Sequence, residues 1–153
     1  MQKHFPIFAD GVMTITNKKG GIMNKEEKEL LIRDLCGRSP YGVKIYDIKN
    51  GIMNLIYVNG IVGEVFISYK TKCRTAPIED VKPYLFPLWR MTKKQKEEFD
   101  ALYWEAREKT CTDFEFKCVY SGIKSDWFNK NHFDYRGLIR KGLAIDCTDI
   151  DVY

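Results

Sequence analysis

Residues 43–69 read VKIYDIKNGIMNLIYVNGIVGEVFISY and contain two Asn-Gly dipeptides, at 50–51 and 59–60, between runs rich in Ile, Val, Tyr and Phe. Asn-Gly favours a two-residue hairpin turn because both central residues of that turn need a positive φ, which Asn tolerates and Gly adopts freely. The stretch therefore predicts an antiparallel three-stranded meander, with strands over residues 43–48, 52–58 and 61–70.

The two predicted turns also fix a register for the meander. They place Ile45 opposite Ile56 and Val58 opposite Ile61, and opposed residues share one face of a sheet. The predicted core face consists of Val43, Ile45, Ile52, Ile56, Val58, Ile61, Val65 and Ile67, with the polar Asp47 and Asn54 among them. The second face carries Lys44, Tyr46, Ile48, Met53, Leu55, Tyr57, Val62, Glu64, Phe66 and Ser68.

This second face is half apolar, which leaves two interpretations open. Either a helix of the protein itself covers part of it, or Tyr46, Tyr57 and Phe66 form an exposed aromatic surface that binds a ligand or a peptide.

Helices are predicted on both sides of the meander. Capping boxes at Asn24 with Glu27 and at Thr92 with Gln95 begin helices over residues 24–36 and 93–109, and Gly37 is expected to end the first of them. Residues 114–120, FEFKCVY, alternate as in a strand. A short helix from Ser125 and a last helical turn over residues 138–143 complete the expectation.

The expected fold class is α+β, with a small curved antiparallel sheet and two or three flanking helices. Residues 78–81 or the strand over 114–120 would close this sheet toward an SH3-like barrel. Residues 1–22 are expected to form an N-terminal extension and residues 23–153 a single domain. Translation from Met23 instead of Met1 is an alternative reading of the extension.

Composition narrows the class of protein. The 153 residues carry 25 basic and 21 acidic side chains, a net charge of +4 that does not by itself indicate a nucleic-acid binder. No apolar run reaches the roughly 20 residues needed to span a bilayer, so we expect a cytoplasmic protein with no membrane partner. The five cysteines are scattered without a C-x-x-C motif, which favours reduced thiols over a disulfide framework or a zinc site.

The densest set of chemically useful side chains lies in residues 132–142, HFDYRGLIRKG. A cation beside aromatic rings can hold a phosphate while a ring stacks on a base. The candidate binding residues here are His132, Phe133, Tyr135, Arg136 and Arg140. The structural alternative is that Asp134 caps a short helix, Arg136 pairs with a carboxylate, Leu138 and Ile139 enter the core, and Gly142 ends the helix.

Three motifs carry a resemblance to a known group: YGVK at 41–44, VKPYL at 81–85 and FDYRGLIRKGLA at 133–144. They resemble a group of small uncharacterised proteins from gut Bacteroides and their phages. The resemblance covers roughly residues 24–150, and residues 110–120 depart from it. It implies a phage or mobile-element context and an accessory role.

No motif of catalysis, metal binding or cofactor binding is present in the sequence. The leading hypothesis is therefore a non-enzymatic binding module that holds a protein partner through the aromatic second face or the segment from Tyr84 to Trp89. The alternative is binding of nucleic acid or a nucleotide through the basic and aromatic stretch 132–141. A small hydrolase is a third class that the sequence leaves open.

Overall fold

A six-stranded sheet forms the body of the protein, and the computed structural model describes residues 8–9, 12–13 and 22–153. The strands run in the order β6-β5-β4-β3-β7-β8, and all neighbours are antiparallel except β7 and β8. Their bounds are β3 (Lys44–Asp47), β4 (Gly51–Asn59), β5 (Glu64–Tyr69), β6 (Lys72–Pro77), β7 (Val81–Leu85) and β8 (Ile145–Asp146). The α+β class is confirmed. The sheet is open, however, and closure toward an SH3-like barrel is not confirmed.

A separate pair of short strands, β1 (Phe8–Ala9) and β2 (Val12–Met13), precedes the sheet. Most of the predicted extension, residues 1–22, lies outside the described residues.

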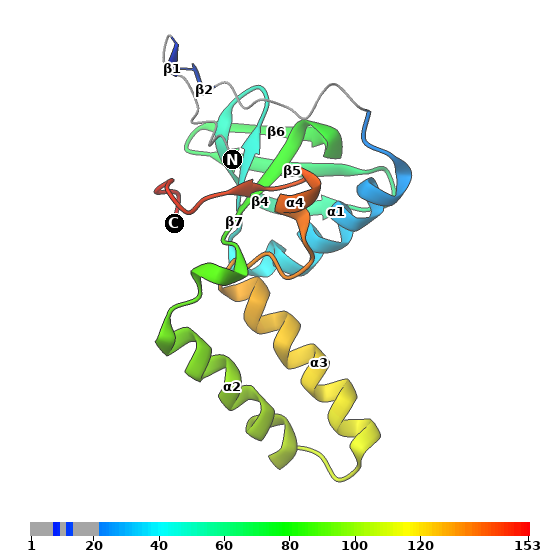
Figure 1. Ribbon diagram of the computed structural model, residues 1–153. Helices are drawn as coiled ribbons and strands as arrows, with labels where there is room; N and C mark the ends of the chain where they lie inside the picture. Colours follow the sequence, from blue (N-terminus) through cyan, green and yellow to red (C-terminus); the bar gives the residue numbers. More distant parts are fainter. Residues whose placement is uncertain (1–7, 10–11, 14–21) are drawn as a thin grey trace.

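Four α-helices accompany the sheet in the described part of the chain (Figure 1). They are α1 (Lys25–Arg38), α2 (Lys93–Glu108), α3 (Asp113–Lys130) and α4 (Leu138–Lys141), joined by the short 3-10 turns η1 (Ser39–Tyr41), η2 (Ile78–Asp80) and η3 (Leu88–Arg90). Both predicted capping boxes are present, so the starts of α1 and α2 are confirmed. Gly37 does not end α1 as predicted. It lies inside the helix, where a Cβ would come within 2.9 Å of the Asn129 amide nitrogen.

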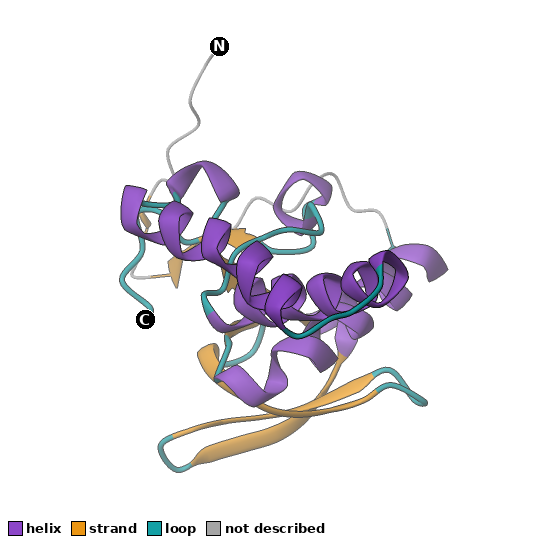
Figure 2. Cartoon of the chain, turned by 90° about the horizontal axis from the view of Figure 1, so that it is seen from below, coloured by secondary structure: helices purple, strands orange, loops and turns teal. Residues whose placement is uncertain are grey.

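Helix α1 covers one face of the sheet, which we call the inner face. Its Leu31 and Leu35 are fully buried against Val43, Ile45 and Val65. Figure 2 shows the helices on one side of strands β4 to β6 and none on the other side, which we call the outer face. The core therefore lies between α1, α4 and the inner face.

The first hairpin has a longer loop than predicted. The changed register exchanges the two faces of β4. Asp47 pairs with Gly51 and Ile45 with Met53, so three residues form the loop in place of two. Gly51, the first residue of β4, adopts a positive φ of +75° directly after this loop, a conformation that glycine takes without strain. This odd shift buries Met53 and Leu55 and leaves Ile52 and Ile56, predicted in the core, 41% and 46% exposed.

The second hairpin also has a longer loop than predicted. Asn59 pairs with Glu64, and the four residues from Gly60 to Gly63 connect them. Gly63 takes the positive φ, +70°, and a Cβ there would lie 2.8 Å from Cε of Lys28 on α1. The loop carries Ile61, which the sequence placed in the core, out to 97% exposure. Val43, Ile45, Val65 and Ile67 are buried as predicted.

The buried Asp47 is neutralised within the sheet. Its carboxylate accepts hydrogen bonds from the guanidinium of Arg74, with Nη2 at 2.7 Å, and Arg74 also pairs with Asp80 at 3.0 Å. A buried carboxylate needs this kind of partner because desolvation of an unpaired charge is costly.

The predicted strand over residues 114–120 is wrong, because these residues form the first half of α3. Thr112 caps the helix by accepting a hydrogen bond from the amide of Glu115. Helical spacing then stacks Phe116 on Tyr120 with 5.3 Å between ring centroids, whereas Phe114 is 79% exposed. The contact with α2 decides the outcome, because only a helix brings these two rings onto Tyr103.

Helices α2 and α3 form a hairpin that projects away from the sheet (Figure 1), and we call it the arm. Tyr103 packs edge-on against Phe116 and Tyr120, and Phe99 packs against Trp127 and Phe128 nearer the sheet. Of its residues, only Ala106, Phe116 and Asn129 are buried. The arm is therefore a two-helix layer held by aromatic contacts.

Candidate functional site

A β-bulge at Ile56 shapes the outer face of the sheet. The register between β4 and β5 shifts between Leu55 and Tyr57, so that Ile56 and Tyr57 both lie exposed. The Ile56 carbonyl, displaced from the ladder, accepts a hydrogen bond from the Ser39 hydroxyl at 3.2 Å. Bulges re-aim side chains in this way, often beside functional sites.

Ile56, Tyr57 and Phe66 make up what we call the aromatic patch. Tyr57 and Phe66 are register partners, and their rings stack with centroids 5.3 Å apart and planes 15° apart. Tyr57 is 53% exposed and Ile56 46% exposed. The patch thus presents apolar surface on the face of the sheet that no described helix covers.

Tyr46, the third predicted member of the aromatic face, does not belong to the patch. It pairs with Ile52 on β4 and with Lys82 on β7. The cross-strand row that contains Lys44, Asn54 and Ser68 separates it from Tyr57 and Phe66. The structure therefore brings together two of the three predicted aromatic residues.

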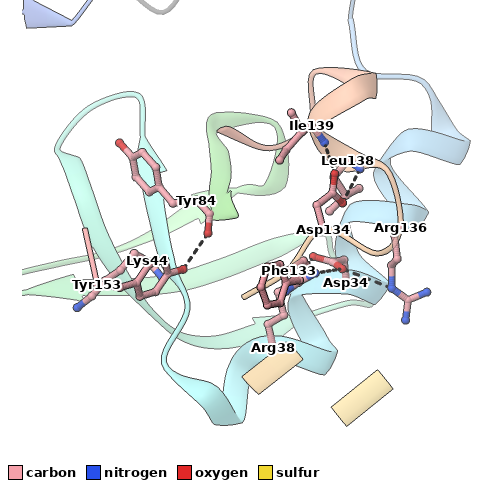
Figure 3. A network of polar contacts seen from close by, with 10 residues as sticks. All are labelled: Asp34, Arg38, Lys44, Tyr84, Phe133, Asp134, Arg136, Leu138, Ile139 and Tyr153. Carbon is pink, nitrogen blue, oxygen red and sulfur yellow. Dashed lines mark hydrogen bonds and ion pairs between the residues drawn. The ribbon is translucent and has the colours of Figure 1, made fainter. Parts of the chain in front are cut away.

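In the second predicted site, residues 132–141, most side chains make contacts inside the protein (Figure 3). The Asp134 carboxylate accepts hydrogen bonds from the amides of Leu138 and Ile139 at 2.8 and 2.9 Å, and so begins α4. Leu138 is fully buried, Ile139 packs against the core, and Gly142 ends the helix with a φ of +74°. Each element of the structural alternative for this stretch is therefore confirmed.

An ion pair with no exposed surface lies beneath this stretch. Arg38 and Asp34 on α1 are both fully buried, with Nε and Oδ2 2.6 Å apart, and Arg38 also donates to the Phe133 carbonyl at 2.8 Å. Arg136 approaches the same carboxylate at 3.4 Å. Burial raises the pKa of Asp34 above its ordinary value, against the opposing effect of Arg38.

The remaining candidate residues differ in accessibility. Tyr135 stacks on Phe128 with centroids 5.0 Å apart, and the guanidiniums of Arg38 and Arg136 lie over its ring. Phe133 is buried and stacks on Trp127 of α3. Arg140 is exposed. Apart from Arg140, these candidates therefore hold α1, α3 and α4 together.

His132 and Tyr153 form a stacked pair at the edge of the network, with centroids 4.0 Å apart. The Tyr153 hydroxyl donates to the Tyr84 carbonyl at 2.8 Å and accepts from the Lys44 amide at 3.1 Å (Figure 3). It bridges β3 and β7 just beyond their last paired residues, Ile45 and Pro83. Burial, together with the nearby Arg38 and Lys44 charges, lowers the pKa of His132 to about 4.

Acid is expected to destabilise the protein through His132. The folded state keeps this imidazole neutral, while an unfolded chain protonates it near its ordinary pKa of about 6.5. The contribution of His132 to the free energy of unfolding is therefore complete above that value and declines as the pH falls toward 4. Urea unfolding of the wild type and of His132→Asn at several pH values measures this contribution.

Asn suits this variant because His132 has a φ of +59°, a region that Asn tolerates. All other titratable groups are common to the two proteins, so the difference between the two curves reports on the imidazole. A difference in unfolding free energy that is constant from pH 7 to pH 4 would contradict the expectation.

Other features offer little reactive chemistry. The five cysteines are free, and only Cys147 is buried. Among the described residues, no group of three or more His, Cys, Asp or Glu side chains is placed to hold a metal ion. No described helix combines the length and hydropathy required to cross a bilayer.

The residues of the segment from Tyr84 to Trp89 differ in their exposure to solvent. Tyr84 and Leu85 are buried within β7, while Leu88 and Trp89 in η3 are 44% and 71% exposed. This part of the chain therefore contributes both to the sheet and to the exposed root of the arm.

A hollow on the sheet surface contains residues that no sequence motif indicated. It has a volume of about 680 Å³ and is lined by Lys44, Asn50, Ile52, Met53, Tyr69, Lys70, Thr71, Lys72, Asp151 and Val152. The only signal in the sequence was the short basic group Lys70, Lys72 and Arg74. Arg74 turns inward to Asp47, so the group does not act as one unit.

Comparisons with protein-family models, with curated proteins and with solved structures gave no match to this chain.

Proposed function

We propose that this protein is a non-enzymatic binding module that holds a protein partner through the aromatic patch, in the accessory role that the resemblance to phage and mobile-element proteins implies. The observation that carries the proposal is the exposed Tyr57, stacked on the half-buried Phe66 and lying beside the exposed Ile56. Aromatic side chains supply large contact areas at low entropic cost, and they are enriched at protein interfaces.

The backbone supports this proposal as well. An exposed Tyr and an exposed Ile next to each other on one face require the bulge, because regular alternation would turn one of them into the core. The hydrogen bond from Ser39 to the Ile56 carbonyl stabilises that bulge. The patch is thus presented by a sheet with a well-packed inner face, as suits a rigid docking surface.

The partner expected from this chemistry is a protein with an apolar, aromatic-accepting surface. Tyr57→Ser is expected to abolish its capture and to leave the thermal midpoint within about 2 °C of the wild type, because the side chain is half exposed. Affinity purification from cells of the natural host, followed by mass spectrometry and binding of the purified partner, measures the loss.

Trp104→Ser provides the matched control. Trp104 is an exposed aromatic residue, 68% accessible, but it lies on α2 in the arm. A partner that is lost with Tyr57→Ser and kept with Trp104→Ser supports the proposal. If the partner is still captured by the Tyr57→Ser variant, or if the thermal midpoint of that variant falls strongly, the proposal is overturned.

A further inference from the structure

We infer that the hollow lined by Lys44, Lys70 and Lys72 binds a small phosphorylated ligand of nucleotide size, with its phosphates on the lysines and its ring on Ile52 and Tyr69. The inference goes beyond the proposed protein-binding function and does not rest on it. The aromatic patch and the hollow lie in different cross-strand rows of the sheet.

The hollow carries an excess of lysine side chains. Lys70 and Lys72 form no ion pair with any described residue, and the Lys44 ammonium donates only to the neutral Asn54 amide oxygen. Elsewhere Arg38 and Arg136 pair with Asp34, and Arg74 pairs with Asp47 and Asp80. Asp151 is the one carboxylate among the described lining residues. The hollow therefore has an excess of positive charge, which favours an anion.

The size and the apolar lining of the hollow suit an organic ligand. A volume of about 680 Å³ lies within the range of small-molecule sites, roughly 300–1,000 Å³. Ile52 and Tyr69 are 41% and 42% exposed. A ligand with both a phosphate and a flat organic part matches this combination of lysines and apolar surface better than a bare anion does.

The β5–β6 turn places a lysine where glycine is favoured. Tyr69 pairs with Lys72, so Lys70 and Thr71 form a two-residue loop, and Lys70 adopts a φ of +53°. The first central residue of such a turn is favourable for Gly and strained for Lys. A lysine at this position holds an ammonium group at the rim of the hollow despite that preference.

These features predict opposite effects on stability and on binding. Lys70→Gly is expected to keep or raise the thermal midpoint by up to about 3 °C, because Gly adopts this φ without strain. The same variant is expected to weaken ADP binding about five- to tenfold, because one charge-assisted contact is lost. Lys70→Gly with Lys72→Gln is expected to abolish binding at millimolar ADP.

The experiment titrates the full chain with ADP, pyrophosphate and adenosine at low and moderate salt, and follows it by calorimetry and by amide shifts in NMR. Tightest binding of ADP, with shifts at Ile52, Tyr69 and Lys70, is expected. Lys96→Gln with Lys130→Gln is the control of equal charge, because neither arm lysine forms an ion pair with a residue that the structure describes. Equal losses in both double variants would overturn the site as non-specific charge attraction.

The other outcomes are equally decisive. No binding of ADP at low salt, about 50 mM, where exposed charges are only weakly screened, would overturn the inference. Pyrophosphate binding as tight as ADP binding would overturn the role of Ile52 and Tyr69. A fall in the thermal midpoint of Lys70→Gly would show that Lys70 stabilises the fold and would contradict the interpretation of the β5–β6 turn.

Discussion

Asp34→Ala is expected to lower the free energy of unfolding by about 3–5 kcal/mol, because it leaves the fully buried Arg38 guanidinium without its carboxylate. Arg38 cannot turn toward water, since its side chain has no exposed surface and its Nη2 is held by the Phe133 carbonyl. Arg136 also loses its carboxylate. Urea denaturation at pH 7 followed by circular dichroism measures the loss.

Two further variants define the origin of this effect. Glu29→Ala removes an exposed partner of Lys25 at 3.8 Å on the same helix, and it is expected to cost less than about 0.5 kcal/mol. Asp34→Leu with Arg38→Met removes both charges, and it is expected to be more stable than Asp34→Ala alone. Equal stability of Asp34→Ala and Asp34→Leu/Arg38→Met would contradict the account of an uncompensated buried charge.

Phe116→Ala is expected to have the second large effect, a loss of about 3 kcal/mol that is concentrated in the arm. The Phe116 ring contacts Tyr103 and Tyr120, and the Arg107 guanidinium lies 3.9 Å from its centroid. No described third layer of structure covers the arm, so its two helices depend on each other. Hydrogen exchange is expected to rise across α2 and the first half of α3, while β3 to β5 stay protected.

Phe114 offers a matched control two residues away. Its ring is 79% exposed, so Phe114→Ala is expected to change stability by less than about 0.5 kcal/mol. If residues 114–120 were a strand, both rings would share one face and the two substitutions would have similar effects. A similar loss from the two variants would therefore contradict the helical arm.

Local signals predicted several elements correctly. The capping boxes at Asn24 and Thr92 began the two helices that they indicated, because a cap involves only residues three apart. Alternation failed in residues 114–120, where Glu115 and Lys117 separate aromatic residues. The contact with Tyr103 of α2, which no local pattern contains, decides for a helix.

In the hairpins, a small error in the predicted loop length changes which side chains of a strand are predicted to be buried. Both Asn-Gly pairs lie at turns, but the positive φ occurs at Gly51 and Gly63 and not at both members of either Asn-Gly pair. The longer first loop inverts β4, so Ile52 and Ile56 exchange places with Met53 and Leu55. In the second loop Gly63 packs against Lys28, a contact between residues 35 positions apart that no local pattern contains.

The same limits apply to the candidate site. Tyr57 and Phe66 could be predicted as neighbours because they lie on adjacent strands of one hairpin. The partner of Arg136, by contrast, is Asp34, about a hundred residues earlier in the chain, and no spacing rule relates the two. The hollow likewise joins β3, the β5–β6 turn and residues 151–152, which meet only in the folded chain.

The arm leaves and rejoins the sheet domain at adjoining points of the backbone. Phe86 and Phe133 form a parallel bridge, in which Phe86 donates to the His132 carbonyl and accepts from the Asp134 amide. The two ends of the inserted hairpin are therefore fastened to each other independently of its length. Lengthening or shortening α2 and α3 by matched turns would change the reach of the arm by about 5.4 Å per turn without altering the sheet register. The length of the arm can therefore vary independently of the sheet domain that carries it.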